Sequence, residues 1–196
     1  VDLGAAPAIQ DAQGSLSSDA SGARRPTMLF RQGTIATVTL PDDSTTTLTN
    51  LRVRATEYTV GPSGPEAMPG DLPPQSAYTY AVEFTVDEAR ALDAKGVAFS
   101  LPSAAAPVDQ YPVSAYLENF LDLPVGTPVP NGHYDPEKGA WLPEKSGVVL
   151  QVVGVTAGRA DRDLTGDGVA DATAALGITD DERAVLAGLY AVNDVL

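Results

Sequence analysis

The chain has 196 residues, with 26 acidic and 12 basic side chains and a formal net charge of −14. This acidity disfavours nucleic acids and anionic membrane surfaces as partners, because both attract basic proteins. No apolar run approaches the roughly 20 residues that a membrane-spanning helix needs, so no membrane insertion is expected. Cysteine is absent and the single histidine is His133, which excludes disulfides, thiolate metal sites and zinc sites built from two histidines.

The first 26 residues are poor in apolar side chains and predict a flexible or loosely docked leader, or one that carries an edge strand. Residues 61–76 hold five prolines and three glycines, which predicts a long loop. Between and after them, β-branched or alternating runs predict strands at 34–40, 45–48, 51–60, 78–85, 97–101, 111–120 and 148–155. The turn signal Asp135-Pro136-Glu137-Lys138-Gly139 predicts a hairpin over 134–141.

Many short strands at similar spacing predict a mainly β fold, with a sandwich or jelly-roll-like body over 27–158. One short helix is expected within 86–94. The composition changes after Gly158, and 159–196 is predicted to form a small appendage of an Asp-rich loop and a helix. Thr179 and Glu182 have the spacing of a capping box, so the helix is expected to begin there and to run to about Tyr190.

The Asp-rich loop is the segment of the sequence with recognisable chemistry. A calcium ion takes six to eight oxygen ligands, and side chains two positions apart in a curled loop converge on one centre. Gly168 permits the sharp turn that such a loop needs. The predicted ligands at positions one, three, five, seven and nine are Asp163, Thr165, Asp167, the carbonyl of Val169, and Asp171.

Position twelve of this pattern is Ala174, where an EF-hand has a bidentate Glu. Asp161 or water is therefore expected to supply the missing oxygens, and the predicted Ca²⁺ site is a weak one. The loop resembles the short Asp-rich calcium loops of dockerin and thrombospondin type 3 repeats. The alternative interpretation is a solvated acidic loop ahead of a helix.

Other chemistry is weakly supported by the sequence. His133 and Asp135 could be imagined as a catalytic dyad, but a lone histidine on a hairpin is more often a surface or packing residue. Asp135-Pro136 could be a self-processing bond in a calcium-triggered module, although Asp-Pro is also a good turn former. Tyr116, Tyr134 and Trp141 could line a sugar or peptide groove, but aromatics in a chain with 6% of them more often anchor the core.

Several segments together resemble a non-repeat domain that lies upstream of the YD repeats in large bacterial Rhs-type proteins. They are residues 51–62 (LRVRATEYTVGP), 76–83 (SAYTYAVE), 118–121 (ENFL), 124–126 (PVG), 134–135 (YD), 139–141 (GAW), the Asp-rich loop and 177–179 (GIT). The resemblance implies an extracellular or cell-surface bacterial setting and no catalytic residues. The chain begins at Val1 and has an apolar end, so we also expect it to be a segment of a larger polypeptide.

These observations predict a non-enzymatic, calcium-stabilised structural module whose partners are other domains of the same long polypeptide. The alternative is an adhesion domain that binds a glycan or a protein through the 61–76 loop and an exposed aromatic side chain. A self-processing module that cleaves at Asp135-Pro136 is the third hypothesis.

Overall fold

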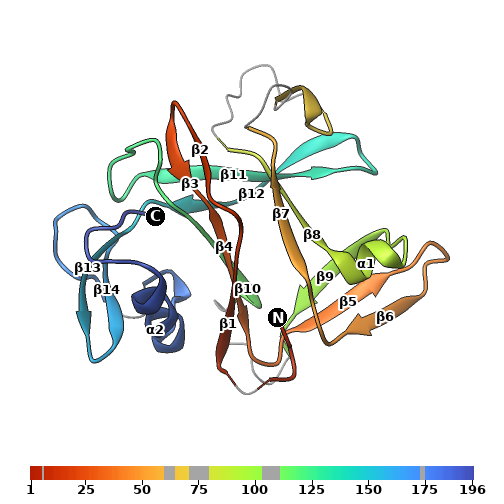
Figure 1. The fold of residues 1–196 in the computed structure, drawn as a ribbon, viewed down its shortest axis with the longest axis horizontal. Coiled ribbons are helices and arrows are strands. Elements are labelled where there is room, and N and C mark those ends of the chain that lie inside the picture. Colours follow the sequence, from red (N-terminus) through yellow and green to blue (C-terminus); the bar gives the residue numbers. More distant parts are fainter. Residues whose placement is uncertain (6, 60–64, 71–79, 103–110, 173–174) are drawn as a thin grey trace.

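The structure is a computed structural model that describes residues 1–5, 7–59, 65–70, 80–102, 111–172 and 175–196. The predicted mainly β fold is confirmed, with 46% of residues in strands and 11% in helices. In the described part of the chain, the strands form six sheets of two or three strands each (Figure 1). Among these same residues, no helix is long and apolar enough to cross a membrane.

The first seven strands are β1 (Ile9–Gln13), β2 (Ser17–Asp19), β3 (Gly22–Arg24), β4 (Pro26–Arg31), β5 (Ile35–Thr39), β6 (Thr45–Leu48) and β7 (Val53–Glu57). The strands that follow are β8 (Val82–Val86), β9 (Gly96–Ser100), β10 (Val113–Leu117), β11 (Pro128–Asp135), β12 (Ala140–Val148), β13 (Gln151–Thr156) and β14 (Arg159–Asp163). The helices are α1 (Asp87–Ala91) and α2 (Asp180–Leu189), with single 3₁₀ turns at η1 (Pro65–Ala67) and η2 (Ala175–Gly177). Every strand pair is antiparallel.

Strand β4 lies between the two hydrophobic cores and is buried on both of its faces. It is the central strand of the sheet β1–β4–β10, and five of its six residues are buried. Successive side chains of a strand point to opposite faces, so Leu29 and Phe30 enter different hydrophobic clusters. Figure 1 shows α2 and the hairpin β13–β14 to one side of β4, and the sheets that contain β5 and β7 to the other side.

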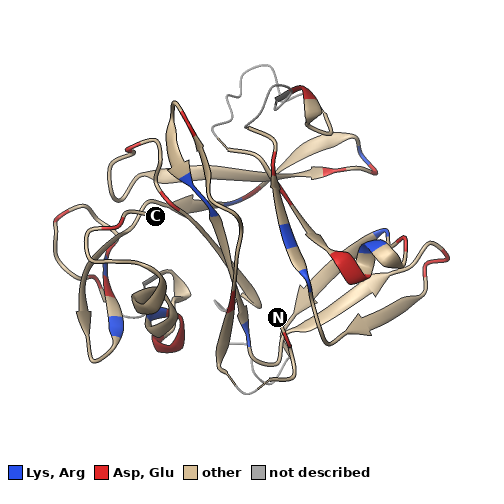
Figure 2. Ribbon diagram, in the orientation of Figure 1, with Lys and Arg blue, Asp and Glu red and all other residues tan. Residues whose placement is uncertain are grey.

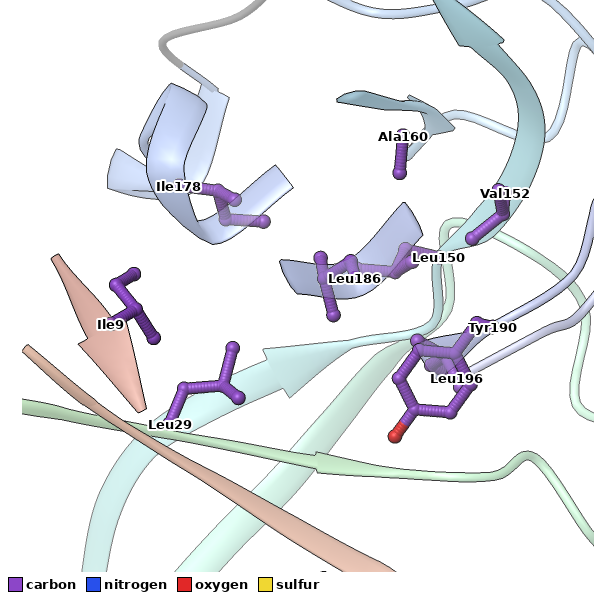
Figure 3. Packing of buried hydrophobic residues seen from close by; sticks show 9 residues of the cluster. All are labelled: Ile9, Leu29, Leu150, Val152, Ala160, Ile178, Leu186, Tyr190 and Leu196. Carbon is purple, nitrogen blue, oxygen red and sulfur yellow. The ribbon is translucent and has the colours of Figure 1, made fainter. Parts of the chain in front are cut away.

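The helix-side core joins the C-terminal segment to the body (Figure 3). Leu186 of α2 is fully buried in it, and the Tyr190 hydroxyl donates a 2.8 Å hydrogen bond to Thr27 Oγ1 of β4. Its buried members are Ile9, Leu29, Leu150, Val152, Ala160, Ile178, Leu186, Tyr190 and Leu196. The predicted C-terminal appendage, residues 159–196, therefore packs directly against β1 and β4.

The sheet-side core lies on the opposite face of β4. Ala36 and Val38 of β5 point into it and are fully buried. The predictions of strands at 34–40 and 45–48 are confirmed by β5 and β6. The buried members of this core are Leu3, Met28, Phe30, Ala36, Val38, Leu51, Val86 and Ala89.

Two expectations about secondary structure differ from the structure. The described residues of 1–26 contain β1, β2, β3 and the start of β4, and Leu3, Ile9 and Arg24 are buried, so the alternative of a flexible leader is wrong. The alternative of a segment with an edge strand is confirmed, because β1 is an edge of the sheet β1–β4–β10. The apolar run 148–155 is not one strand, because β12 ends at Val148 and β13 begins at Gln151 in another sheet. Of the predicted strand 78–85 and the predicted loop 61–76, residues 78–79, 61–64 and 71–76 lie outside the described residues.

Candidate functional site

The Asp-rich loop follows directly from β14 and leads toward α2. The hairpin β13–β14 turns through Ala157 and Gly158, both with positive φ, and β14 ends at Asp163. Two hydrogen bonds close the base of the loop: Asp171 N–H donates to the Arg162 carbonyl at 2.7 Å, and Leu164 N–H donates to Asp171 Oδ2 at 2.7 Å. The loop is thus anchored at both ends on a strand that is packed against α2.

The Asp163 carboxylate lies at the centre of the loop and is 1% exposed. Its Oδ1 accepts hydrogen bonds from the N–H groups of Thr165 at 2.9 Å and Gly166 at 2.7 Å, and its Oδ2 accepts one from Gly168 at 2.7 Å. Burial by itself raises the pKa of Asp163, but these hydrogen bonds outweigh it and leave the pKa below its ordinary value. Gly166 and Gly168 have φ of +81° and +77°, which explains the two glycines at these positions.

The other predicted ligands belong to the same loop, but their carboxylates do not converge. Asp167 Oδ1 accepts a hydrogen bond from Val169 N–H at 2.8 Å, and Asp171 is held at the base of the loop. Within the described residues, no group of three or more His, Cys, Asp or Glu side chains is placed to hold a metal ion. The oxygen types suit Ca²⁺, but binding would require Asp167 and Asp171 to turn toward Asp163.

Asp161, which with water is one of the two expected sources of the missing calcium oxygens, makes contacts outside the loop. Its Oδ1 lies 2.8 Å from Arg183 Nη2, and its Oδ2 accepts a 2.6 Å hydrogen bond from Thr156 Oγ1. Asp161 of β14 lies opposite Gly154 of β13. A side chain at position 154 would place its Cβ 3.3 Å from Asp161 Oδ2, so the glycine leaves room for this carboxylate. Both oxygens are therefore engaged, and the side chain connects α2 to the hairpin β13–β14.

The imagined dyad of His133 and Asp135 is not formed. His133 Nδ1 lies 2.7 Å from Glu144 Oε1 across the hairpin β11–β12, and both side chains are 51% exposed. Asp135 caps the hairpin turn, accepting hydrogen bonds from the N–H groups of Glu137 at 3.0 Å and Lys138 at 3.1 Å. The hairpin predicted over 134–141 is confirmed, although it extends over all of β11 and β12.

The three aromatic residues proposed for a groove make internal contacts. Tyr134 and Trp141 form an edge-to-face pair with centroids 5.6 Å apart, and Trp141 Nε1 donates to the Gly70 carbonyl at 3.1 Å. The Tyr116 hydroxyl donates a 2.8 Å hydrogen bond to Glu182 Oε1. Burial and the neighbouring Glu182 carboxylate raise the pKa of Tyr116 well above its ordinary value.

A buried ionic cluster around Glu182 was not predicted from the sequence. Its Oε2 lies 2.7 Å from Arg31 Nη2, and Arg31 Nη1 donates to Thr179 Oγ1 at 3.1 Å. A signal was present, because Glu182 and Leu186 are four positions apart and therefore share one face of α2. An acidic residue on the apolar face of a helix indicates a buried partner.

No family model, no curated protein and no solved structure matches the chain.

Proposed function

We propose that the chain is a non-enzymatic structural module of a large extracellular or cell-surface bacterial protein, and that its C-terminal loop binds Ca²⁺. The ligands in this proposal are the side chains of Asp163, Thr165, Asp167 and Asp171 and the carbonyl of Val169. Water completes the shell, and Asp161 is left to its ion pair with Arg183.

The observation that carries the proposal is the curled course of the loop backbone around Asp163. Three main-chain N–H groups of the loop point at this carboxylate, so the chain is already wrapped about the first predicted ligand. The carboxylates of Asp167 and Asp171 lie on the same short loop, and a cation would reduce their mutual repulsion.

A bound calcium ion would affect the packing of α2, because of where the loop lies. The loop lies between β14 and the segment that leads to α2, so fixing it would hold the helix against the hairpin β13–β14. An ion that binds the folded but not the unfolded chain stabilises the fold by mass action. A weak site of this kind would be filled at the calcium concentrations of extracellular modules and would order the appendage there.

The test is thermal unfolding in EDTA and then in millimolar calcium. We expect calcium to raise the Tm of the wild-type chain, and Asp167→Asn and Asp171→Asn each to reduce this rise. The double variant Asp163→Ala with Asp167→Ala should remove most of it. Asp122→Asn is the matched control, because this acidic residue lies outside the loop and should leave the calcium-dependent rise intact.

Asp163 also accepts hydrogen bonds from the loop, so its replacement will lower the Tm in EDTA as well. The quantity that tests the proposal is therefore the difference between the two Tm values of each variant. If the wild-type Tm is the same in EDTA and in calcium, the loop is an acidic surface loop and the calcium proposal is wrong.

A further inference from the structure

A cavity of about 670 Å³ lies alongside β10. Every residue of β10 from Val113 to Leu117 lines it, together with residues 144–148 of β12 and, from the C-terminal segment, Ile178 and Leu196. Side chains of a strand alternate between its faces, so a cavity that contacts all successive residues runs along the edge of the strand. Its volume falls within the range of ordinary ligand sites.

Among the described residues, no strand pairs with the edge of β10 that lies beside this cavity. Arg31 N–H of β4 donates to the Pro112 carbonyl at 3.1 Å. In an antiparallel pair of strands, every second residue directs its main-chain N–H and C=O groups toward the partner strand. Ser114 and Tyr116, two and four positions after Pro112, therefore also direct these groups toward β4. The N–H and C=O groups of the residues between them therefore point away from β4, and β4 is the one strand paired with β10 in the described part of the chain. These outward residues are Val113, Ala115 and Leu117.

The usual protections of an edge strand are missing from β10. Such edges commonly carry a charged side chain, a proline or a bulge, which prevents pairing with another chain. The sequence of β10 is Val-Ser-Ala-Tyr-Leu, its ladder with β4 is regular, and Ala115 at its middle is exposed. An unprotected edge beside an apolar cavity is a template for an added strand, whose alternate side chains would enter the cavity.

The charge beside the cavity indicates what the added strand carries. Lys145 Nζ lies 3.2 Å from the Tyr111 hydroxyl and 5.2 Å from the centre of that ring. Over the described ranges, no carboxylate lies within ion-pair distance of Lys145, although the chain as a whole is acidic (Figure 2). The three carboxylates that line the cavity contact a basic residue each: Glu118 contacts Arg25, Glu144 contacts His133, and Glu182 contacts Arg31.

We propose that the open edge of β10 binds an extended strand of a separate protein partner. The strand has apolar β-branched residues at alternate positions, which fill the cavity, and an acidic residue that reaches Lys145. A second copy of this chain that paired through its own β10 would bring only Glu118 beside that strand, and this carboxylate is already paired with Arg25. The site does not involve the loop at 163–171, so it goes beyond the structural function proposed above.

The experiment is a selection from a library of random twelve-residue peptides displayed on phage, with the complete chain immobilised. Ala115→Pro is the blocking variant: its missing N–H faces the cavity side, so the ladder with β4 is kept. Asp11→Pro is the matched control, because Asp11 has the same outward position on β1, the opposite edge of the same sheet.

We expect selected peptides to alternate β-branched residues and to share one Asp or Glu. They should bind the wild-type chain and the Asp11→Pro variant with equal affinity. Their affinity for Ala115→Pro should be about tenfold lower, because this variant loses one or two hydrogen bonds to the peptide and the alignment of the added strand. Selection on Lys145→Glu should replace the shared acidic residue by Lys or Arg. If Ala115→Pro does not fold, slowed amide exchange of Val113, Ala115 and Leu117 in the peptide-bound wild-type chain provides the same test.

Three results would overturn the proposal. The first is no enrichment of any peptide over the bare support. The second is enriched peptides that bind Ala115→Pro as tightly as wild type or that leave the three amides unprotected. The third is a wild-type dimer that Ala115→Pro converts to a monomer, which would assign the edge to a second copy of the chain.

Discussion

The guanidinium of Arg31 lies 2.7 Å from the carboxylate of Glu182, and the two residues are 151 positions apart in the sequence. The side chains are 12% and 2% exposed, so this ion pair is almost entirely removed from water. Tyr116 donates to the second oxygen of the same carboxylate. The cluster joins β4, β10 and α2, and it lies at the boundary of the helix-side core.

Replacing Glu182 with Ala should lower the free energy of unfolding by about 3–5 kcal/mol, because it leaves the Arg31 guanidinium, which is only 12% exposed, without its counter-charge. Asp181 is exposed and lies at the preceding position of the same helix, so Asp181→Ala should change this free energy by no more than about 0.5 kcal/mol. Urea denaturation followed by circular dichroism measures both values. A similar small loss for the two variants would mean that the ion pair contributes little to stability.

A second buried cation, Arg24, connects the hairpin β2–β3 to β7. It is 1% exposed, and its Nη2 lies 2.8 Å from Asp19 Oδ2 and 2.6 Å from Glu57 Oε1. The guanidinium also lies 4.3 Å from the centre of the Phe120 ring. The hydrogen bond from Arg24 is the main cause that lowers the pKa of Asp19 to about 2.

This pKa predicts loss of stability in acid. The ordinary pKa of Asp19 is 3.8, so its ionised form is favoured by folding. The contribution is fully present above pH 3.8 and disappears as the pH falls toward 2. Asp19→Asn should therefore flatten the dependence of Tm on pH in this window while it lowers the Tm at neutral pH. Parallel Tm–pH curves for the variant and the wild type below pH 4 would contradict this assignment.

Two glycines should respond oppositely to replacement by alanine. A Cβ at Gly70 would lie 2.6 Å from Tyr134 Cε2, so Gly70→Ala should displace the loop from the Tyr134–Trp141 pair and cost about 1–3 kcal/mol. A Cβ at Gly188, within α2, meets nothing within 4 Å. Gly188→Ala should stabilise the chain by about 0.5–1 kcal/mol through helix propensity. Thermal and urea unfolding would test both signs, and a destabilised Gly188→Ala would refute the second.

The Asp135-Pro136 bond should remain intact. The Asp135 carboxylate is held by the Lys138 ammonium at 2.8 Å and by two main-chain N–H groups, with Lys138 the main cause that lowers its pKa. It is therefore ionised and fixed in the turn at neutral pH. Intact mass after incubation with millimolar calcium should equal the starting mass. Appearance of two fragments that separate at this bond would instead support the self-processing hypothesis.

Local signals in the sequence predicted the elements that depend on few neighbouring residues. The turn at 135–139 specified a hairpin, and the β-branched run at 34–40 specified β5. Thr179 was predicted as a helix cap, and its Oγ1 accepts the Glu182 N–H at 3.3 Å. In each case the physical cause lies within a few positions: a turn geometry, a side-chain alternation or a capping hydrogen bond.

The sequence by itself therefore determined the class of the fold, the main hairpin, the start of α2 and the order of oxygen-bearing residues in the Asp-rich loop. The tertiary structure decided that β4 is buried on both faces, that the run 148–155 divides between two sheets, and that Asp161 binds Arg183. Burial and charge pairing depend on which segments, far apart in the sequence, come into contact in the fold. A pattern of nearby residues does not specify these contacts. Arg31 and Glu182 show the difference most directly: the position of Glu182 on the apolar face of α2 indicates a buried partner, but only the fold pairs it with Arg31, which is 151 positions away.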